Sequence, residues 1–575
     1  VRTTVLVAKE EALGYAEASL YFEPTREKVR VLYARSFNPD GTVSSLSPDQ
    51  IRITKGSSGG VSFDQYQQLS FTIPGAKVGS LIDYSYETEE FNPFDKNLFQ
   101  GFFFFKGSDP VVNTVLRVRT PKDKPLHFVT PNMTAEKAKP REFEENGMRV
   151  YEWQDQQVGP IIPEPSMPPM RDVLPGVAYC LQKDWTYMVN RLKPMFDKRF
   201  QLTDAVKKKV DEITAGAKTL EEKIGRLYLF CQKEIRYISI KGNLSSNQVG
   251  HAAEETLKTR YGDCTDKGML LSTMLKHIGV EAYPVGIRTN NAGKAIRELP
   301  IFDSNHCITE VILNGKKTFL DSTATDYRFP YFRADDHDTL AENTMTGTLD
   351  QIPLPPPEDN AISNTRDLTL SKDGSLKIDF FSVQNGTAEA GSREGVRSMK
   401  PEEYEKQVRA AVAGLSADYT LEVATFSNPL DFNSPFTAHS GYTLNRYVPR
   451  SGKYLILEIP YYRMRFSEVS LAERTYPIQY MTSSLRSDDI SITLPDGVRV
   501  KYLPPSVDWK TPYIEYSAKY ESTGKAVKIS RRFAYLKREV PVKDYASHKE
   551  TLEKLSRSTE ERIVLEDTSV KGGGK

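Results

Sequence analysis

Cys264, His306 and Asp321 are the residues whose types could together perform acyl-transfer chemistry. In such chemistry a cysteine thiolate attacks an amide carbonyl, an imidazole transfers the proton, and a carboxylate orients the imidazole. The three residues are far apart along the chain, so the elements that carry them must bring them together. The elements predicted around each residue therefore decide whether this chemistry is available.

Cys264 stands at the predicted start of a helix. Gly262 permits a tight turn before it, Asp263 is a natural N-cap, and Gly279 closes the helix. The apolar residues of this helix share one face: Leu270, Leu271, Met274, Leu275 and Ile278. In the first turn of a helix, unpaired N–H groups and the helix dipole favour a thiolate over a thiol. We therefore expect Cys264 to be an activated nucleophile.

A hairpin is predicted to place a base beside a carboxylate. Asn314-Gly315, between two β-runs, is typical of a two-residue type I′ turn. Counting outward from the turn puts Ile308 opposite Asp321 and His306 opposite Thr323. Because side chains alternate between faces, His306 and Asp321 are then diagonal neighbours, about 7–8 Å apart in the main chain, and their side chains can meet. A slip of one residue would put Asp321 on the wrong face.

The remaining candidates near this region are weaker. The same alternation points Cys307 to the opposite face, where we expect a packed and inert thiol. His277 is at the far end of the cysteine helix, roughly 20 Å from Cys264, which excludes it as the base. His251 precedes the cysteine turn, and both a place at the site and a surface position are open for it. A core histidine beside a solvated aspartate is the alternative for His306.

Three stretches of the sequence carry a resemblance to a known family. They are Tyr261-Gly262-Asp263-Cys264-Thr265-Asp266-Lys267, the helix end Ile278-Gly279-Val280-Glu281-Ala282, and the strand pair with His306 and Leu320-Asp321-Ser322-Thr323. These stretches resemble the transglutaminase-like core of bacterial proteins. The resemblance implies a papain-related cysteine fold with Cys264 as nucleophile, His306 as base and Asp321 as the residue that orients it. No acidic cluster is arranged as a calcium loop, so we expect neither a metal nor a cofactor.

Gln248 is the candidate for the oxyanion hole. It occupies the place where related cores carry a polar residue ahead of the nucleophile. Together with the backbone N–H of Cys264 it would stabilise the oxyanion, and one such donor is worth about 3–4 kcal/mol in acyl transfer. A loop glutamine without a catalytic role is the alternative.

Charge, cysteine content and hydropathy exclude several classes of protein. Lys and Arg (77) balance Asp and Glu (76) to a net charge of +1, which gives no support for binding nucleic acid or an anionic membrane. The four cysteines form neither a disulfide framework nor a CxxC zinc motif. No apolar run reaches the 18 or more residues of a membrane span. The chain starts at Val1 rather than Met, so we expect that an upstream segment is missing, for which a signal peptide is one explanation. Export to the periplasm or cell surface is what the resemblance implies.

Turn and proline signals predict a multidomain α+β protein. The expected parts, in order, are an antiparallel β-sandwich (1–158), a Pro-rich linker packed along a neighbour (159–175), a transglutaminase-like α+β core of helices followed by an antiparallel sheet (176–340), a second linker (341–362) and a mainly β domain with one helix near 401–415 and a terminal helix near 544–564 (363–575). The first and last parts resemble the domain of unknown function and the β-rich partner domain that flank such cores in Bacteroidetes-type exported proteins.

Two classes of function follow from these patterns. The first is a cysteine-dependent acyl transfer on peptide or protein amides, cell-envelope material among them. Hydrolysis is favoured over transamidation, because water needs no dedicated site. The second is a non-catalytic binding or scaffolding protein that retains the fold, since large β domains without sites of their own flank the core. A further hypothesis is that the flanking domains and the Pro-rich linker gate the cleft.

Overall fold

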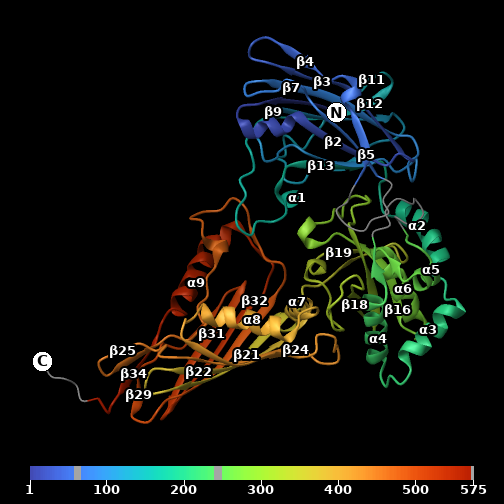
Figure 1. The fold of residues 1–575 in the computed structure, drawn as a ribbon. Helices are drawn as coiled ribbons and strands as arrows, with labels where there is room; N and C mark the ends of the chain where they lie inside the picture. Colours follow the sequence, from blue (N-terminus) through green and yellow to red (C-terminus); the bar gives the residue numbers. More distant parts are fainter. Residues whose placement is uncertain (57–65, 239–248, 571–575) are drawn as a thin grey trace.

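The structure is a computed structural model that describes residues 1–56, 66–238 and 249–570. It consists of a β-rich N-terminal region, a central α+β core and a β-rich C-terminal domain, as the sequence predicts. Figure 1 shows the N-terminal region above the other two parts, which lie next to each other.

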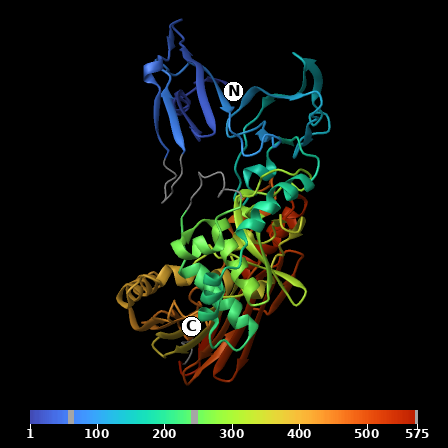
Figure 2. The ribbon, with the colours of Figure 1, turned by 90° about the vertical axis from the view of Figure 1, so that its right-hand side faces the viewer.

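The N-terminal region contains four small antiparallel sheets in two units. The first unit has the sheets β1-β7-β3-β4 and β2-β6-β5, and the second has β10-β13-β8 and β11-β12-β9. The strands are β1 (Arg2–Leu6), β2 (Glu17–Phe22), β3 (Glu27–Phe37), β4 (Val43–Ser45), β5 (Arg52–Lys55), β6 (Gln67–Thr72), β7 (Leu81–Glu90), β8 (Gln100–Phe104), β9 (Val111–Pro121), β10 (His127–Val129), β11 (Arg141–Glu145), β12 (Met148–Val158) and β13 (Gly176–Cys180). Each unit has its own apolar cluster, and Figure 2 shows them as two lobes. The single predicted sandwich is therefore replaced by two β units.

The boundary between the N-terminal region and the core lies after Cys180. The boundary predicted from the sequence, between residues 175 and 176, is wrong because it assigns β13 to the core. Strand β13 pairs with β8 and β10 of the N-terminal region. Val177, Ala178 and Cys180 are fully buried in this sheet. A short strand that is buried on both faces has no alternating pattern, so its sheet cannot be inferred from its own sequence.

The Pro-rich linker is bound to both following domains, and it contains the short helix α1 (Met170–Val173). The Glu164 carboxylate accepts hydrogen bonds from the backbone N–H groups of Thr475 (2.7 Å) and Tyr476 (3.2 Å) in the C-terminal domain. Arg171 donates to Asp303 of the core at 2.6 Å, three residues before His306. The linker thus packs along its neighbours through polar contacts. Two of the interleaved apolar residues behind the packing prediction, Ile162 (74% exposed) and Met170 (43%), instead lie at the surface.

The core combines helices with a five-stranded antiparallel sheet of order β18-β17-β16-β19-β20. Its elements are α2 (Thr186–Arg199), α3 (Asp204–Thr214), α4 (Leu220–Lys233), β14 (Arg236–Tyr237), α5 (Ala253–Thr259), β15 (Tyr261–Gly262), α6 (Cys264–His277), β16 (Glu281–Ile287), β17 (His306–Leu313), β18 (Lys316–Leu320), β19 (Leu340–Asn343) and β20 (Thr348–Gln351). The predicted linker 341–362 is wrong over its first half, because β19 pairs with β16 and β20 extends the same sheet.

Helix α6 lies at the centre of the core. It contacts α3, α4 and α5 on one side and β16 and β17 on the other. The predicted apolar face is buried: Leu270, Leu271, Met274 and Leu275 have no exposed surface. Gly279 follows the helix with φ +78°, and the N–H of Val280 donates to the carbonyl of Leu275. A helix that is enclosed on all sides holds its first residue in a fixed place.

The C-terminal domain is built on the eight-stranded sheet β23-β24-β22-β21-β28-β32-β31-β30 and the four-stranded sheet β25-β26-β34-β29, with a two-stranded pair β27-β33 beside them. Its elements are β21 (Ala361–Leu370), β22 (Leu376–Gln384), α7 (Gly386–Val396), α8 (Pro401–Ala413), β23 (Tyr419–Phe426), β24 (Phe436–Leu444), β25 (Arg450–Ser451), β26 (Tyr454–Leu457), β27 (Ile478–Gln479), β28 (Ser484–Thr493), β29 (Val498–Tyr502), β30 (Val507–Lys510), β31 (Ile514–Thr523), β32 (Ala526–Tyr535), β33 (Glu539–Val540), α9 (Tyr545–Ser558) and β34 (Ile563–Asp567).

Two features of this domain differ from the sequence prediction. Helix α7 was not predicted, and the terminal helix ends at Ser558 rather than continuing to residue 564. Residues 563–567 form β34, which pairs with both β26 and β29. Ile563 and Leu565 are buried in the domain core at alternate positions, which is the period of a strand.

The C-terminal domain holds the segment that follows Asp321. Arg328 forms an ion pair with Glu389 of α7 at 3.1 Å, and Arg397 forms one with Asp326 at 2.6 Å. His337 Nδ1 lies 2.8 Å from the Thr482 hydroxyl. Residues 326–337 of the core are therefore fixed by side chains of the C-terminal domain.

Among the described residues, no helix is both long and apolar enough to cross a membrane.

Because α6 is enclosed by the core, a substitution that leaves a cavity on its buried face should destabilise the core. Leu271→Ala should lower the free energy of unfolding of the core by about 2–5 kcal/mol, because Leu271 is fully buried. Unfolding in urea can be followed by the accessibility of the buried Cys231 thiol in the same core. Leu430→Ala is the matched control, since Leu430 is 60% exposed and its loss should change stability by about 0.5 kcal/mol at most. Equal losses in the two variants would contradict this account of α6.

Candidate active site

Cys264 is the first residue of α6, and a reciprocal cap fixes the start of the helix. The Asp263 carboxylate accepts hydrogen bonds from the backbone N–H groups of Thr265 (2.9 Å) and Asp266 (3.2 Å). In return, the Asp266 carboxylate accepts the N–H of Asp263 at 2.9 Å. The predicted N-cap is confirmed, and the thiol lies where the helix dipole favours negative charge.

Asp266 connects this cap to the loop in front of it. It accepts the backbone N–H of His251 at 2.6 Å, and His251 Nδ1 lies 3.0 Å from the same oxygen. The hydrogen bond with Asp266 raises the pKa of His251 even though burial opposes it. A side chain at Gly250, which has φ +66°, would meet Asp266 at 2.8 Å. Of the two places open for His251, the structure therefore shows the one at the site, where His251 holds the cap of the cysteine helix.

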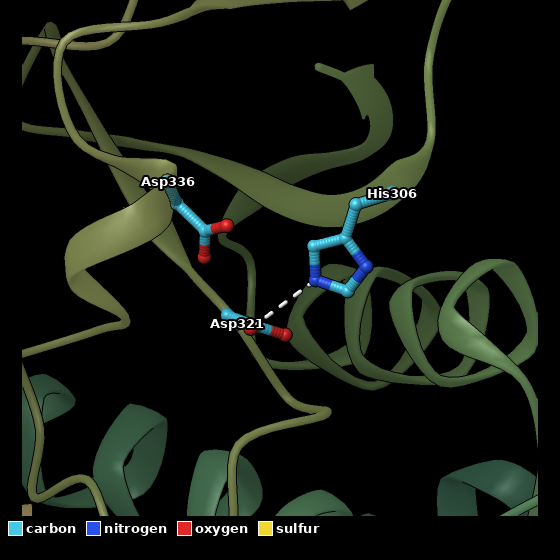
Figure 3. A group of neighbouring side chains, drawn as sticks. All are labelled: His306, Asp321 and Asp336. Carbon is cyan, nitrogen blue, oxygen red and sulfur yellow. Dashed lines mark hydrogen bonds and ion pairs between the residues drawn. The ribbon is translucent and has the colours of Figure 1, made fainter. Parts of the chain in front are cut away.

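The hairpin brings His306 and Asp321 together. Leu313 pairs with Lys316 and Thr309 with Leu320, as counted from the predicted turn, and Asn314 has φ +52° as a type I′ turn requires. Strand β18 ends at Leu320, so Asp321 is the first residue after it. His306 Nε2 lies 3.2 Å from Asp321 Oδ2, which Figure 3 shows. The register prediction is thus confirmed for the ladder between Thr309–Leu313 and Lys316–Leu320, while the predicted pairs of Ile308 with Asp321 and His306 with Thr323 lie beyond its end.

Asp321 is a fully buried carboxylate with several donors. Its Oδ1 accepts the backbone N–H of Thr323 (2.8 Å) and the Thr323 hydroxyl (2.7 Å), and Arg333 Nε lies 3.7 Å from Oδ2. Burial alone would raise the pKa of Asp321. The charge and hydrogen bond of His306, the Thr323 hydroxyl and the charge of Arg333 instead lower this pKa to about 2. Asp321 is therefore ionised at neutral pH.

His306 is held as an imidazolium between the carboxylate and the thiol. Burial would lower its pKa, but the charge of Asp321, hydrogen bonds with Asp321 and Cys264, and the charge of Asp336 outweigh burial and raise the pKa well above 6.5. Since Asp321 engages Nε2, Nδ1 is the ring nitrogen left for the thiol. This arrangement favours the imidazolium form of His306 beside the Cys264 sulfur.

Tyr237 is a neighbour of the thiol that sequence reasoning missed. It lies on β14, which runs parallel to β15 and pairs Tyr237 with Gly262, two residues before Cys264. Tyr237 is 43% exposed, and its partial burial, the charges of Cys264 and Asp263, and a hydrogen bond with Cys264 raise the pKa of the phenol. A two-residue strand has no periodicity, so the sequence held no signal for this pairing.

The other cysteines are packed. Cys307 faces α6, where a side chain at Gly268 would lie 3.3 Å from its sulfur, and burial raises its pKa well above 9. Burial also raises the pKa of Cys231 to about 12 and raises that of Cys180. Because an uncharged thiol is a poor nucleophile, these three cysteines are poor candidates for chemistry.

Gln248 and His277 are the two remaining residues that the sequence singled out. Gln248, the oxyanion candidate, lies outside the described residues. His277 is at the far end of α6, where Nε2 lies 2.8 Å from Asp211, which agrees with its exclusion as the base.

Asp336 is a second carboxyl beside the histidine that sequence reasoning also missed. It ends the short helix η4 (Ala334–Asp336) and has no exposed surface. Burial and the negative charge of Asp321 raise the pKa of Asp336 well above its usual value. The adjacent acidic residues Asp335-Asp336 were visible in the sequence, but no strand register relates this irregular segment to His306.

Each of the three parts of the chain is similar to a known family or domain. Residues 207–321 match the Transglutaminase-like superfamily. Residues 1–162 match a domain of unknown function with a solved structure (DUF3857), and residues 453–565 match a second such domain (DUF3858). The chain thus carries a transglutaminase-like core flanked by these two domains, as the resemblance in the sequence predicts.

One solved structure supports the same fold. A crystal structure from Parabacteroides distasonis ATCC 8503, described as a "putative protease", has a TM-score of 0.67 at 12% identity and covers 98% of this chain and 94% of its own. A "putative cysteine protease" from Cytophaga hutchinsonii has 13% identity and covers 40% of this chain and 79% of its own, with a TM-score of 0.19, too low to argue from. None of the curated proteins matches the chain.

The charged pair predicts how His306 titrates. In the unmodified protein His306 should remain protonated well above pH 6.5, because Asp321 stabilises the imidazolium. In Asp321→Asn the charge and its hydrogen bond are lost while burial remains, so the pKa of His306 should fall by at least about 1. NMR of histidine labelled with ¹³C, with His306→Ala to assign the signal, measures both values. An unchanged titration in Asp321→Asn would show that the pair does not control the imidazole.

The surroundings of the four thiols predict selective alkylation. At pH 6 iodoacetamide should modify Cys264 at least about tenfold faster than Cys307, because only Cys264 has an imidazolium beside it. Mass spectrometry of the digested protein separates the four sites. In His306→Ala the preference for Cys264 should disappear. A Cys264 that reacts no faster than free cysteine at this pH would contradict an activated nucleophile.

Proposed function

We propose that this chain is a cysteine-dependent acyl-transfer enzyme that hydrolyses amides of peptides or proteins. The observation that carries the proposal is the meeting of Cys264, at the start of a buried helix, with the buried His306–Asp321 pair. The nucleophile, base and orienting carboxylate of such an enzyme require this arrangement. The likeness of residues 207–321 to the transglutaminase-like superfamily gives further support.

In the acylation step, the Cys264 thiolate attacks the carbonyl carbon of the amide and forms a carbon–sulfur bond. The carbonyl oxygen becomes an oxyanion, and the backbone N–H of Cys264 is a donor suited to stabilise it at the helix start. The Nδ1–H of His306 then protonates the leaving nitrogen as the carbon–nitrogen bond breaks. The products are a free amine and a thioester on Cys264, with His306 now neutral.

In the deacylation step, neutral His306 accepts a proton from water through Nδ1. The resulting hydroxide attacks the thioester, and the carbon–sulfur bond breaks to release a carboxylic acid. Asp321 stabilises the imidazolium that forms again, and the thiolate is restored. An amine in place of water would give transamidation, which needs a second binding site for the amine.

The preference for peptides rests on two further arguments. Water needs no dedicated site, so hydrolysis is the simpler reaction for this geometry. The similar structure from P. distasonis is described as a "putative protease". Export to the periplasm or cell surface, with cell-envelope peptides among the substrates, extends this proposal and rests on the sequence resemblance alone.

Turnover of peptide libraries, including cell-wall peptides, tests the proposal. The unmodified protein should cleave a subset of the peptides, and Cys264→Ala should lose at least about a thousandfold in kcat/KM, because the nucleophile is removed. Mass spectrometry should detect an acyl group on Cys264 when a slow ester substrate is used. A protein that cleaves no peptide and forms no acyl-enzyme would instead support the non-catalytic binding protein.

The balance of products separates hydrolysis from transamidation. With a primary amine added at millimolar concentration, we expect the carboxylic acid to remain the main product of the thioester. Chromatography with mass detection measures both products, and Cys264→Ala serves as the blank. An amide as the main product at low amine concentration would reassign the protein to the transglutaminases.

A further inference from the structure

Asp336 is buried without the partners that a carboxyl group requires. Neither of its oxygens has exposed surface, and neither has a hydrogen-bond partner among the described residues. Asp321, its neighbour, is equally buried but accepts hydrogen bonds from His306 and Thr323. An unsatisfied buried carboxyl costs several kcal/mol and is rare in folded proteins. Something beyond the protein's own donors would remove this cost.

The oxygens of Asp336 face the catalytic pair. One ligand atom each from His306, Asp321 and Asp336 lie within 4.8 Å of one another. Figure 3 shows the carboxyl of Asp336 turned toward the edge of the imidazole that carries Nε2, on the same side as Asp321. The three side chains come from the start of β17, the residue after β18 and the end of η4. They converge from three directions, as ligands of a central ion do.

The side chains around Asp336 carry an excess of negative charge, which favours binding of a divalent cation. Asp321, Asp335 and Asp336 can contribute three negative charges, and Arg333, which is paired with Asp335, contributes one positive charge. With His306 neutral, the cluster then carries a net charge of about −2, and two of its carboxyl groups, those of Asp321 and Asp336, have no exposed surface. A divalent cation bound between these side chains would neutralise it.

We propose that His306 Nε2, Asp321 and Asp336 form a binding site for a divalent transition metal, for which Zn²⁺ is the probe. One imidazole and two carboxylates are ligands that Zn²⁺ accepts in proteins. Zinc bonds of about 2.0–2.2 Å separate tetrahedral ligands by about 3.3–3.6 Å, and His306 Nε2 and Asp321 Oδ2 are already 3.2 Å apart. Asp336 must approach by at most about 1.5 Å to complete the set.

Metal binding and the proposed catalysis exclude each other at His306. The metal replaces the proton on Nε2, and that proton is released to solvent together with any proton that the carboxyl groups hold. The imidazole then keeps only its Nδ1 proton, and losing that proton to a leaving amine would create a metal-bound imidazolate. Asp321, now a metal ligand, no longer orients the free imidazole. The site therefore acts as a reversible brake on acyl transfer, and this consequence alone rests on the proposed function.

The number and type of ligands at this site disfavour Ca²⁺ and Mg²⁺. Ca²⁺ and Mg²⁺ prefer six or more oxygen ligands, and this site offers two carboxylates and a nitrogen. The carboxylates have no exposed surface, while the His306 side chain is 10% exposed. A metal reaches the site past the imidazole, so the protein should be incubated with the metal before measurement.

Direct binding tests the site without any substrate. The full chain, first treated with EDTA, is incubated with ZnCl₂, passed over a desalting column and analysed for bound zinc, and its affinity is measured against a chromophoric chelator. We expect one tight zinc per chain, and Asp336→Asn, which keeps the shape of the side chain, should weaken the affinity at least about tenfold. A chain without tight zinc, or an Asp336→Asn variant with unchanged affinity, would overturn the proposal. Thermal unfolding without metal checks that the variant folds.

Two variants exclude other origins of zinc binding. Cys264→Ala should keep the tight site, because the thiol is not a ligand, and loss of the site in this variant would place the zinc between Cys264 and His306 instead. His439→Ala removes an exposed pair in which His439 lies 2.7 Å from Asp379. It should leave the tight site unchanged, and loss of zinc there would show that the metal sits on the surface.

Alkylation measures the consequence for the thiol. Bound Zn²⁺ should slow the reaction of Cys264 with iodoacetamide in the unmodified protein, EDTA should restore the rate, and CaCl₂ should have no effect. In Asp336→Asn the zinc concentration needed for half of the effect should rise at least about tenfold, in parallel with the affinity. If zinc binds tightly through Asp336 but leaves alkylation unchanged, the brake is disproved while the site stands. If zinc binds and peptides are not cleaved, only the proposed function fails.

Discussion

The buried hydrogen bond between His306 and Asp321 is the interaction on which the rest of the site depends. Two opposite charges are removed from water here, so each is stable only because the other is present. The Thr323 hydroxyl and backbone N–H donate further hydrogen bonds to Asp321. On its other side, the imidazole forms a hydrogen bond with the sulfur of Cys264. Burial alone would lower the pKa of His306 and favour loss of its proton. The ion pair with Asp321 outweighs burial and stabilises the imidazolium beside Cys264.

Precision at this site comes from elements that cannot move independently. Helix α6 is enclosed by helices and sheet, and its cap links Asp263, Asp266 and His251 to the residue that bears the thiol. The hairpin that carries His306 is packed against the same helix. A thiol on one element and an imidazole on another can therefore stay in register without a flexible loop between them.

Local patterns predicted the centre of the site, and long-range packing decided the rest. The N-cap at Asp263 and the Asn314-Gly315 turn are local signals, and both the helix start and the strand register follow from them. Asp336 lies in an irregular segment, whose position depends on contacts with another domain that no periodicity encodes. The same limit explains why β13 and β34 were misassigned, since their partners are remote in sequence. The three parts of the chain were predicted correctly because prolines and turns separate them in the sequence, although their exact boundaries were not.

The contacts across the domain boundary change what counts as the functional unit of this protein. The match to the transglutaminase-like superfamily ends at residue 321, yet the segment that supports this carboxylate continues to Asp336 and His337. Glu389, Arg397 and Thr482 of the C-terminal domain fasten that segment. A fragment cut at the family boundary would retain the three reactive groups but lose the frame around two of them. In this protein the structural unit that holds Cys264, His306 and Asp321 in place is larger than the part that matches the superfamily.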